Sequence, residues 1–373
     1  LLPRGMPLAG DAPQVLLVRI LYSFVVFAAG VAAARMSRTA YGVAPQPTLD
    51  ASRASMDLYP STDLSESCPS VPGTIDLVIS SPCAQLAGVE YNLTVRKLGK
   101  WRNHPDDDVT SRIIKETGTY EPMHTRHVCR ALHSTRDRGP GHALRRPRMV
   151  DVGVNVGWYT MLGAMLGADV TSFEPNPHSR AIVARSLCLN ARRLRPDAVR
   201  LMPFGAASTS QTCYLFQPIK NVGNTFVRCG GTLQERLNEL NAWGRSQGGK
   251  GVRFKSAGEV KLRRVDEFVA PPIDVFKIDI EGNEQNALDG FAPLFPTMMA
   301  TRGRAAAGPS AEPAGTTRPR GMPLLGLQPA LVLSEFWPRY SASLGLNPAD
   351  YLLFFVRARV GSIVDPSNPM STE

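Results

Sequence analysis

The sequence predicts an α/β fold in which a mostly parallel, doubly wound sheet carries helices on both faces. Two strand patterns carry this prediction. Residues 149–152 form a short apolar run that enters a glycine-rich loop, and apolar residues resume at helical spacing from Trp158. Residues 169–174 read as a second strand, which ends in an acid about 20 residues past the loop. Further apolar runs alternate with helical segments as far as residue 365, which favours parallel strands and right-handed crossovers.

The N-terminal 100 residues precede this alternation. Residues 20–34 are apolar and free of charge, so residues 1–40 are expected to be a signal anchor or another targeting segment. Arg19, near one end of the run, could snorkel to the membrane surface. A cleaved signal peptide and an organelle transit peptide are the alternatives. Residues 37 to about 72 are rich in Ser, Thr, Ala and Pro, and residues 41–100 are expected to be a mostly irregular stem.

The remaining chain divides into a helical part and the α/β domain. Two helices, at 106–116 and 124–132, are expected within a small subdomain at 101–147, the first after three aspartates that suit a helix N-terminus. The α/β domain is assigned to 148–365, followed by a tail at 366–373. Its expected strands lie at 149–152, 169–174, 199–204, 212–217, 273–280, 330–334 and 362–365, and its expected helices at 158–166, 177–190, from 283, and at 350–356. Glycine- and arginine-rich insertions near 230–258 and 301–329 are expected to be disordered.

Charge and cysteine content limit the possible partners. The 373-residue chain has a net charge of +10, but its basic residues are not interleaved with aromatic ones, so nucleic acid is not an expected partner. None of its six cysteines forms a C-x-x-C pair, which disfavours a zinc site, and no metal is expected. The even number permits disulfides without assigning any. Cys188 falls in an expected helix and is predicted to be a small core residue.

Acids follow several expected strands, where an open α/β sheet binds its ligands. They are Asp151, Glu174, Asp279, Glu281 and Glu335. So many carboxylates disfavour a phosphate-rich ligand and favour one that combines a ribose with positive charge, such as S-adenosylmethionine. Asp151 could hold its amino group, Glu174 could accept the ribose hydroxyls, and the amides of the glycine loop could face the adenosyl and carboxylate parts.

Methyl transfer to a hydroxyl needs orientation and a base. The acceptor must approach to about 3–3.5 Å of the methyl carbon, and its proton must be taken up. Asp279, Glu281 and Glu284 stand where that base is expected, after the strand at 273–280. Lys277 is interpreted as a structural partner of these acids.

Five segments together resemble the FkbM family of S-adenosylmethionine-dependent methyltransferases. They are Val150-Asp-Val-Gly-Val-Asn-Val-Gly157, Phe173-Glu-Pro-Asn176, Asn190, Phe276-Lys-Ile-Asp-Ile-Glu-Gly-Asn-Glu284 and Leu331-Val-Leu-Ser-Glu335. The resemblance covers roughly residues 106–365, and the block that starts at Lys277 is its most specific motif.

That resemblance implies a Rossmann-like class I fold and O-methylation of a sugar, glycan or secondary-metabolite hydroxyl. It assigns cofactor binding to Asp151, Gly153, Asn155, Gly157 and Glu174, and the reaction side to Asp279, Glu281 and Glu284. The apolar N-terminus and the Ala/Arg-rich insertions resemble a green-algal, membrane-anchored version, single-pass in the endoplasmic reticulum or Golgi, with secretion or the chloroplast as alternatives. One departure is that the terminal strand hairpin of the fold is short or missing.

Three other functions compete with this interpretation. An NAD(P)-dependent oxidoreductase is disfavoured because the loop is not G-x-G-x-x-G and no Tyr-x-x-x-Lys pair follows. A nucleic-acid methyltransferase is disfavoured because no Asn-Pro-Pro-Tyr motif occurs after the fourth strand. A catalytically inactive or truncated methyltransferase-fold binding module is consistent with the short C-terminus.

Overall fold

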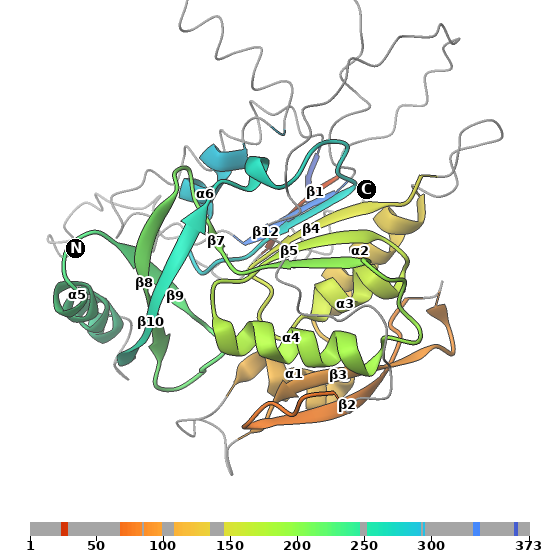
Figure 1. Cartoon of the computed structure of the whole chain (residues 1–373), viewed down its shortest axis with the longest axis horizontal. Coiled ribbons are helices and arrows are strands. Elements are labelled where there is room, and N and C mark those ends of the chain that lie inside the picture. The colour runs from red at the N-terminus through yellow and green to blue at the C-terminus, as the bar shows by residue number, and fades with distance from the viewer. Residues whose placement is uncertain are drawn as a thin grey trace, which may run out of the picture.

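The structure, a computed structural model, consists of a large sheet flanked by helices, a smaller sheet beside it and a two-stranded hairpin (Figure 1). It describes residues 24–28, 68–83, 86–98, 108–134, 145–246, 252–291, 294, 331–335 and 362–364. The expected insertion at 301–329 and the expected helix at 350–356 lie outside these residues.

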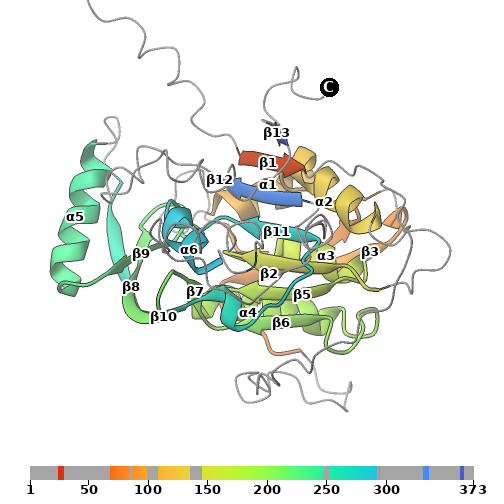
Figure 2. The same cartoon turned by 90° about the horizontal axis from the view of Figure 1, so that it is seen from above.

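Five parallel strands make up most of the large sheet, in the order β12-β11-β4-β5-β6, with β6 at one edge. Figure 2 shows β12, β11, β5 and β6 in this order across the sheet. Their bounds are Arg148–Val152 for β4, Asp169–Phe173 for β5, Val199–Met202 for β6, Val275–Ile278 for β11 and Leu331–Glu335 for β12. The predicted α/β fold is therefore confirmed.

Two further strands complete the large sheet beyond β12. Strand β1 (Phe24–Ala28) pairs antiparallel with β12, and β13 (Ser362–Val364) pairs antiparallel with β1. They hold the two outer positions, where the terminal hairpin was expected to be short or missing. Strand β1 falls within the segment expected to be an anchor, most of which lies outside the described residues. No helix among the described residues is both long and apolar enough to cross a membrane, and the anchor stays a prediction.

Helices cover both faces of the large sheet. On one face α2 (Pro122–Ser134), α3 (Trp158–Met165) and α4 (Pro177–Leu189) pack over strand residues such as Met149 and Val170. On the other face α6 (Glu284–Phe291) packs over residues such as Val150, Val152 and Phe276. Successive strand residues thus enter opposite cores, which explains why these strands are apolar almost throughout.

A hairpin and a short helix precede the α/β domain. Strands β2 (Thr74–Ser80) and β3 (Glu90–Arg96) pair antiparallel, and α1 (Val109–Thr117) follows. The prediction of a mostly irregular stem at 41–100 was wrong for these strands, because Tyr91, Leu93 and Val95 alternate into the core.

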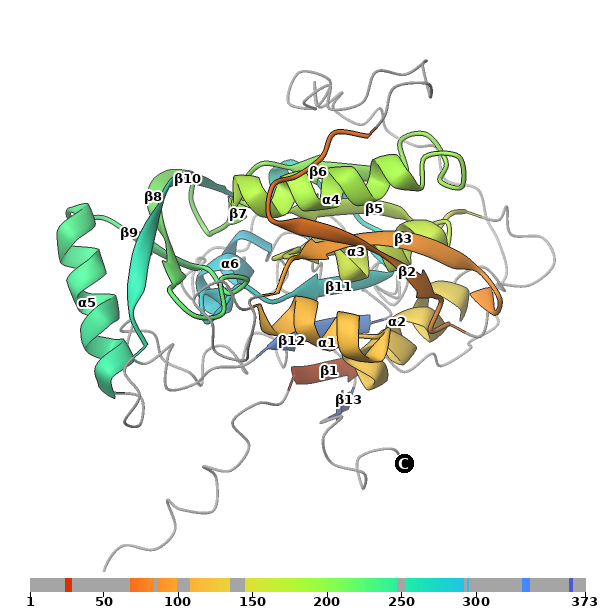
Figure 3. The ribbon, with the colours of Figure 1, turned by 90° about the horizontal axis from the view of Figure 1, so that it is seen from below.

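The hairpin lies across α4 (Figure 3). Asn190, at the C-terminal end of α4, fixes the hairpin to it. The Asn190 side chain accepts from the Asn92 backbone N–H at 2.9 Å and donates to the Asn92 carbonyl at 2.7 Å. We call β2, β3, α1 and α2 the N-terminal subdomain.

The smaller sheet has the order β7-β10-β8-β9 and carries α5 (Leu233–Ser246). Its strands are β7 (Gly205–Ala206), β8 (Gln211–Pro218), β9 (Phe226–Cys229) and β10 (Phe254–Arg263). The disorder predicted near 230–258 was therefore wrong at 233–246 and from 254 onward. Helix α5 starts with reciprocal hydrogen bonds between Thr232 and Glu235, and the aromatic rings of Phe226, Trp243 and Phe254 pack together beside it.

All six cysteines form disulfides: Cys68–Cys188, Cys83–Cys129 and Cys213–Cys229. The first ties the residues before β2 to α4, the second ties the hairpin to α2, and the third crosses between β8 and β9. Cys188 is thus a disulfide partner, and its prediction as a simple core residue was wrong. Spacing along the chain could not have paired it with a cysteine 120 positions away.

Candidate functional site

The glycine loop between β4 and α3 needs its unusual residues. Gly153, Asn155 and Gly157 all have left-handed backbones, with φ of +81°, +54° and +88°. At Gly153 a Cβ would lie 1.8 Å from the carbonyl oxygen of Asp279. Only glycine therefore lets this loop lie directly against the segment that follows β11.

Glu174, at the end of β5, faces the glycine loop. Its Oε2 accepts from the Asn155 backbone N–H at 2.9 Å, and its Oε1 accepts from the Asn176 N–H at 2.8 Å. The residue is 4% exposed. Burial raises the pKa of Glu174, while the two amides and the guanidinium of Arg96 act in the opposite direction.

A cavity opens at the carboxyl ends of these strands. Its empty space is about 610 Å³, counting space open to solvent. Five of the predicted site residues line it: Gly153, Asn155, Glu174, Asp279 and Glu281.

The opposite side of the cavity comes from outside the large sheet. Gly223, Thr225 and Val227, from the β8–β9 connection and β9, line it together with Leu262 of β10. These residues could not be identified from the sequence, because they belong to no motif and their position depends on how the smaller sheet docks.

Asp151 and Gly157 lie behind the cavity wall. Asp151 is 1% exposed and its Oδ2 accepts from the Thr160 hydroxyl at 2.7 Å. Its Oδ1 lies 3.6 Å from the Nζ of Lys277, which also donates to the Gly153 carbonyl at 2.6 Å. Asp151 therefore contacts Lys277, the residue that supports the glycine loop from below. Gly157 is the N-cap residue of α3.

Lys277 is the buried cation beneath the loop. Its Nζ lies 3.7 Å from Asp279 Oδ2 as well as near Asp151. Burial alone would lower the pKa of Lys277, yet the neighbouring carboxylates of Asp279 and Asp151 raise it. The charged ammonium balances part of the acidic charge at the cavity, which agrees with its interpretation as a structural partner of the acids.

The three acids after β11 do not share one environment. Glu281 has a left-handed backbone, with φ of +58°, and lines the cavity. Glu284 stands behind it, where its Oε1 accepts from the backbone N–H groups of Ile280 at 2.8 Å and Gly282 at 3.1 Å. The structure thus brings Asp279 and Glu281 to the cavity and uses Glu284 to hold the turn that carries them.

Burial and mutual repulsion control the protonation of these acids. The pKa of Glu281 is raised well above its usual value by burial and by the nearby carboxyls of Asp279 and Glu284. Burial raises the pKa of Glu284 to about 7, although its two amide donors oppose the shift. Asp279 Oδ1 and Glu281 Oε2 have no hydrogen-bond partner among the described residues. Each is therefore available to a ligand group that donates a hydrogen bond.

The described residues contain no group of three His, Cys, Asp or Glu side chains arranged to hold a metal ion. The site's polar groups are instead carboxylates and backbone amides around a small cavity. Such a set suits a ligand with hydroxyl donors and positive charge.

Comparison with known proteins identifies the domain that contains the cavity. Residues 151–299 match the model of the methyltransferase FkbM domain. No curated protein matches the chain. A solved methyltransferase FkbM from Methylobacillus flagellatus KT is similar at 14% identity and a TM-score of 0.26, over 52% of this chain and 49% of that one. The chain thus spans about half the length of that relative. The cavity therefore lies within a segment, residues 151–299, that matches the domain of a family of S-adenosylmethionine-dependent methyltransferases.

Proposed function

We propose that this chain transfers the methyl group of S-adenosylmethionine to a hydroxyl of a sugar, a glycan or a related metabolite. The observation that carries the proposal is the cavity at the carboxyl ends of the parallel strands. It gathers the glycine loop, Glu174 and two acids with unpartnered oxygens into one place.

The residues present fit the cofactor. Each oxygen of Glu174 accepts one backbone N–H, and a carboxylate oxygen has room for a second donor, such as a ribose hydroxyl. The close approach of Gly153 to the Asp279 carbonyl brings the glycine loop against the segment that carries Asp279 and Glu281, so that both line one cavity. The acidic lining suits the positive sulfonium and amino group, and the bound cofactor supplies an activated methyl group.

We assign to Glu281 the role of the base that removes the proton of the acceptor hydroxyl. Its Oε2 is buried and unpartnered, so it could accept the proton that an acceptor hydroxyl held there gives up. The carboxyl must first be ionised, and its pKa is raised. Turnover should therefore rise with pH until Glu281 has lost its proton. Asp279, on the same wall, is the second candidate for this role.

We also propose that the chain works in an oxidising compartment, such as the lumen of the endoplasmic reticulum or Golgi, with secretion or the chloroplast as alternatives. The support is that all six cysteines are paired, a pattern typical of proteins folded under oxidising conditions. A membrane anchor within residues 1–40 belongs to the same proposal. Non-reducing peptide mapping of protein from cells tests it, and free thiols at all six positions would contradict it.

Transfer of a labelled methyl group to neutral sugars and glycans tests the activity directly. We expect incorporation by the wild type, with turnover rising with pH. Glu281→Gln should retain the affinity for S-adenosylhomocysteine and lose most of the turnover. Cofactor binding without transfer to any acceptor would instead favour a binding module, and full turnover in Glu281→Gln would remove Glu281 from the mechanism.

A further inference from the structure

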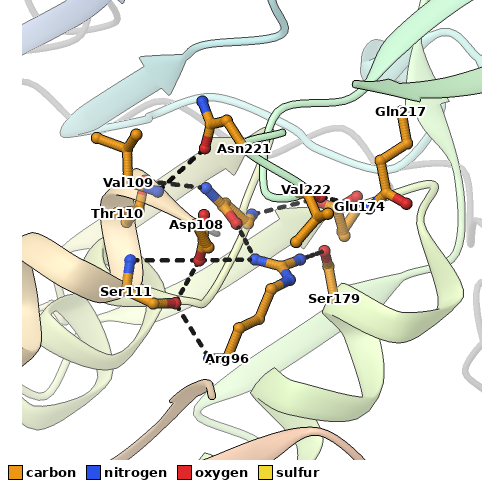
Figure 4. A network of polar contacts seen from close by, with 11 residues as sticks. Arg96, Asp108, Val109, Thr110, Ser111, Glu174, Ser179, Gln217, Asn221 and Val222 are labelled. Atoms are coloured by element: carbon orange, nitrogen blue, oxygen red, sulfur yellow. Dashed lines mark hydrogen bonds and ion pairs between the residues drawn. The ribbon is translucent and has the colours of Figure 1, made fainter. Parts of the chain in front are cut away.

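A buried arginine outside the matched domain contacts a residue that lines the cavity. Arg96 ends strand β3 of the N-terminal subdomain and is 3% exposed. Figure 4 shows its guanidinium between Asp108 and Ser179. Both terminal nitrogens of the guanidinium are hydrogen-bonded, whereas Nε has no partner among the described residues. A buried charged group depends on such bonds, so the partners of the two terminal nitrogens indicate what Arg96 holds in place.

Three elements meet at this guanidinium. Nη1 donates to the Oδ1 of Asn155 in the glycine loop at 2.7 Å and to Asp108 Oδ2 at 3.3 Å. Nη2 donates to the hydroxyl of Ser179, in the first turn of α4, at 2.6 Å. Asn155 lines the cavity, and its backbone N–H donates to Glu174. Arg96 therefore fixes the side chain of Asn155, and the backbone N–H of Asn155 in turn holds Glu174, the carboxylate proposed to bind the ribose.

Asp108 extends the same cluster to the far wall of the cavity. It caps α1 by accepting from the Ser111 N–H at 3.2 Å. Gly223, which lines the cavity, packs so closely that a Cβ there would lie 2.0 Å from Asp108 Oδ1. The Val109 N–H donates to the Oδ1 of Asn221 in the same loop at 3.0 Å. The N-terminus of α1 thus holds in place the 221–225 loop, which forms this wall of the cavity.

We propose that Arg96 is a positioning residue for the cofactor, an inference that depends on the proposed function. With Asp108 it holds the glycine loop on one side of the cavity and the 221–225 loop on the other. The binding-competent cavity accordingly requires the N-terminal subdomain, which lies outside the matched residues 151–299.

Arg185 offers a matched control. It also joins the N-terminal subdomain to α4, through an ion pair of 2.6 Å with Asp76 of β2 and hydrogen bonds of 2.9 Å to the carbonyls of Cys68 and Pro69. None of these partners lines the cavity. Removing Arg185 weakens subdomain docking without touching the cofactor site.

The test is calorimetric titration of the full chain with S-adenosylhomocysteine, beside thermal unfolding of each variant. We expect Arg96→Met to raise the Kd at least tenfold and Arg96→Lys to raise it less, because an ammonium keeps the charge but cannot serve all three partners. Arg185→Met should lower the Tm and leave the Kd within twofold. A folded Arg96→Met with wild-type Kd, or equal loss in Arg185→Met, would overturn the proposal.

Asn155→Ala keeps the proposal testable if Arg96→Met does not fold. It removes the acceptor in the glycine loop and the 3.3 Å hydrogen bond that the Asn155 amide donates to the Thr110 hydroxyl of α1, so the Kd should again rise about tenfold, and a wild-type Kd would overturn the positioning role. Where both single variants fold, the double variant should bind no more weakly than the worse single one, because both remove the same contact. If the losses of binding free energy in the two single variants add up in the double variant, the two residues do not act through a shared contact. If the wild type itself fails to bind, the proposed function is what fails.

Discussion

Glu284 gives the chain a pH-dependent stability that a single substitution should remove. The residue is 2% exposed, and its Oε1 accepts the N–H groups of Ile280 and Gly282 in the turn before α6. Burial raises its pKa from the ordinary 4.5 to about 7 in the folded chain. The folded state therefore holds a proton that the unfolded state releases at lower pH.

The sign and size of the effect follow from this difference. Below pH 4.5 both states are protonated, and Glu284 contributes its full stability. As the pH rises, the unfolded state loses the proton first, so the contribution falls and is fully lost above about pH 7. At about 1.4 kcal/mol for each tenfold change in proton affinity, the loss amounts to roughly 3 kcal/mol.

Glu284→Gln keeps the amide-accepting oxygen and nearly the same volume but cannot ionise. Urea unfolding between pH 4.5 and 8 should show the variant gaining about 3 kcal/mol relative to the wild type as the pH rises. Glu284→Ala is the control, since it should be destabilised at the acidic end of the range by the loss of both hydrogen bonds. Parallel pH profiles for Glu284→Gln and the wild type would refute the reasoning.

Three further substitutions probe the loop, the cofactor and the small sheet. Gly153→Ala should lower the free energy of unfolding by at least about 2 kcal/mol, because its Cβ would collide with the Asp279 carbonyl; an unchanged Tm would contradict this. Glu174→Ala should weaken S-adenosylhomocysteine binding by about 1–3 kcal/mol, and equal affinity in calorimetry would count against its ribose role. Replacing both Cys213 and Cys229 by Ser should cost about 3 kcal/mol in urea unfolding, and no change would show that the disulfide does not stabilise the fold.

The parallel core could be predicted from the sequence because its signals are local. A strand followed by glycines and a helix, as around Gly153, is a pattern whose local conformation can be predicted from the neighbouring residues alone. The fixed order of strands in such folds then placed Glu174, Asp279 and Glu281 at one edge. The cavity lining bears out that placement.

The hairpin and α5 were missed for a different reason. Residues 233–246 are polar enough to suggest a loop. Residues 74–96 are richer in apolar residues, but they were assigned to a stem together with the Ser-, Thr-, Ala- and Pro-rich segment before them. The alternation of Tyr91, Leu93 and Val95 was the available signal for β3. For α5 the signal was Thr232 followed by Glu235, which resembles a helix cap.

Arg96 and the 221–225 loop could not have been assigned to the site from the sequence. Arg96 lies 59 positions from Asn155, in a segment with no motif, and their contact depends on how the hairpin docks on α4. Such contacts between domains follow from tertiary packing, which residue patterns alone do not specify.

Calorimetric titration of the wild-type chain with S-adenosylhomocysteine, beside NAD, tests the central claim most directly. One-to-one binding of S-adenosylhomocysteine with no heat from NAD is the predicted result. Binding of NAD alone, or of neither ligand by a folded chain, would contradict a cavity built for a sulfonium nucleoside.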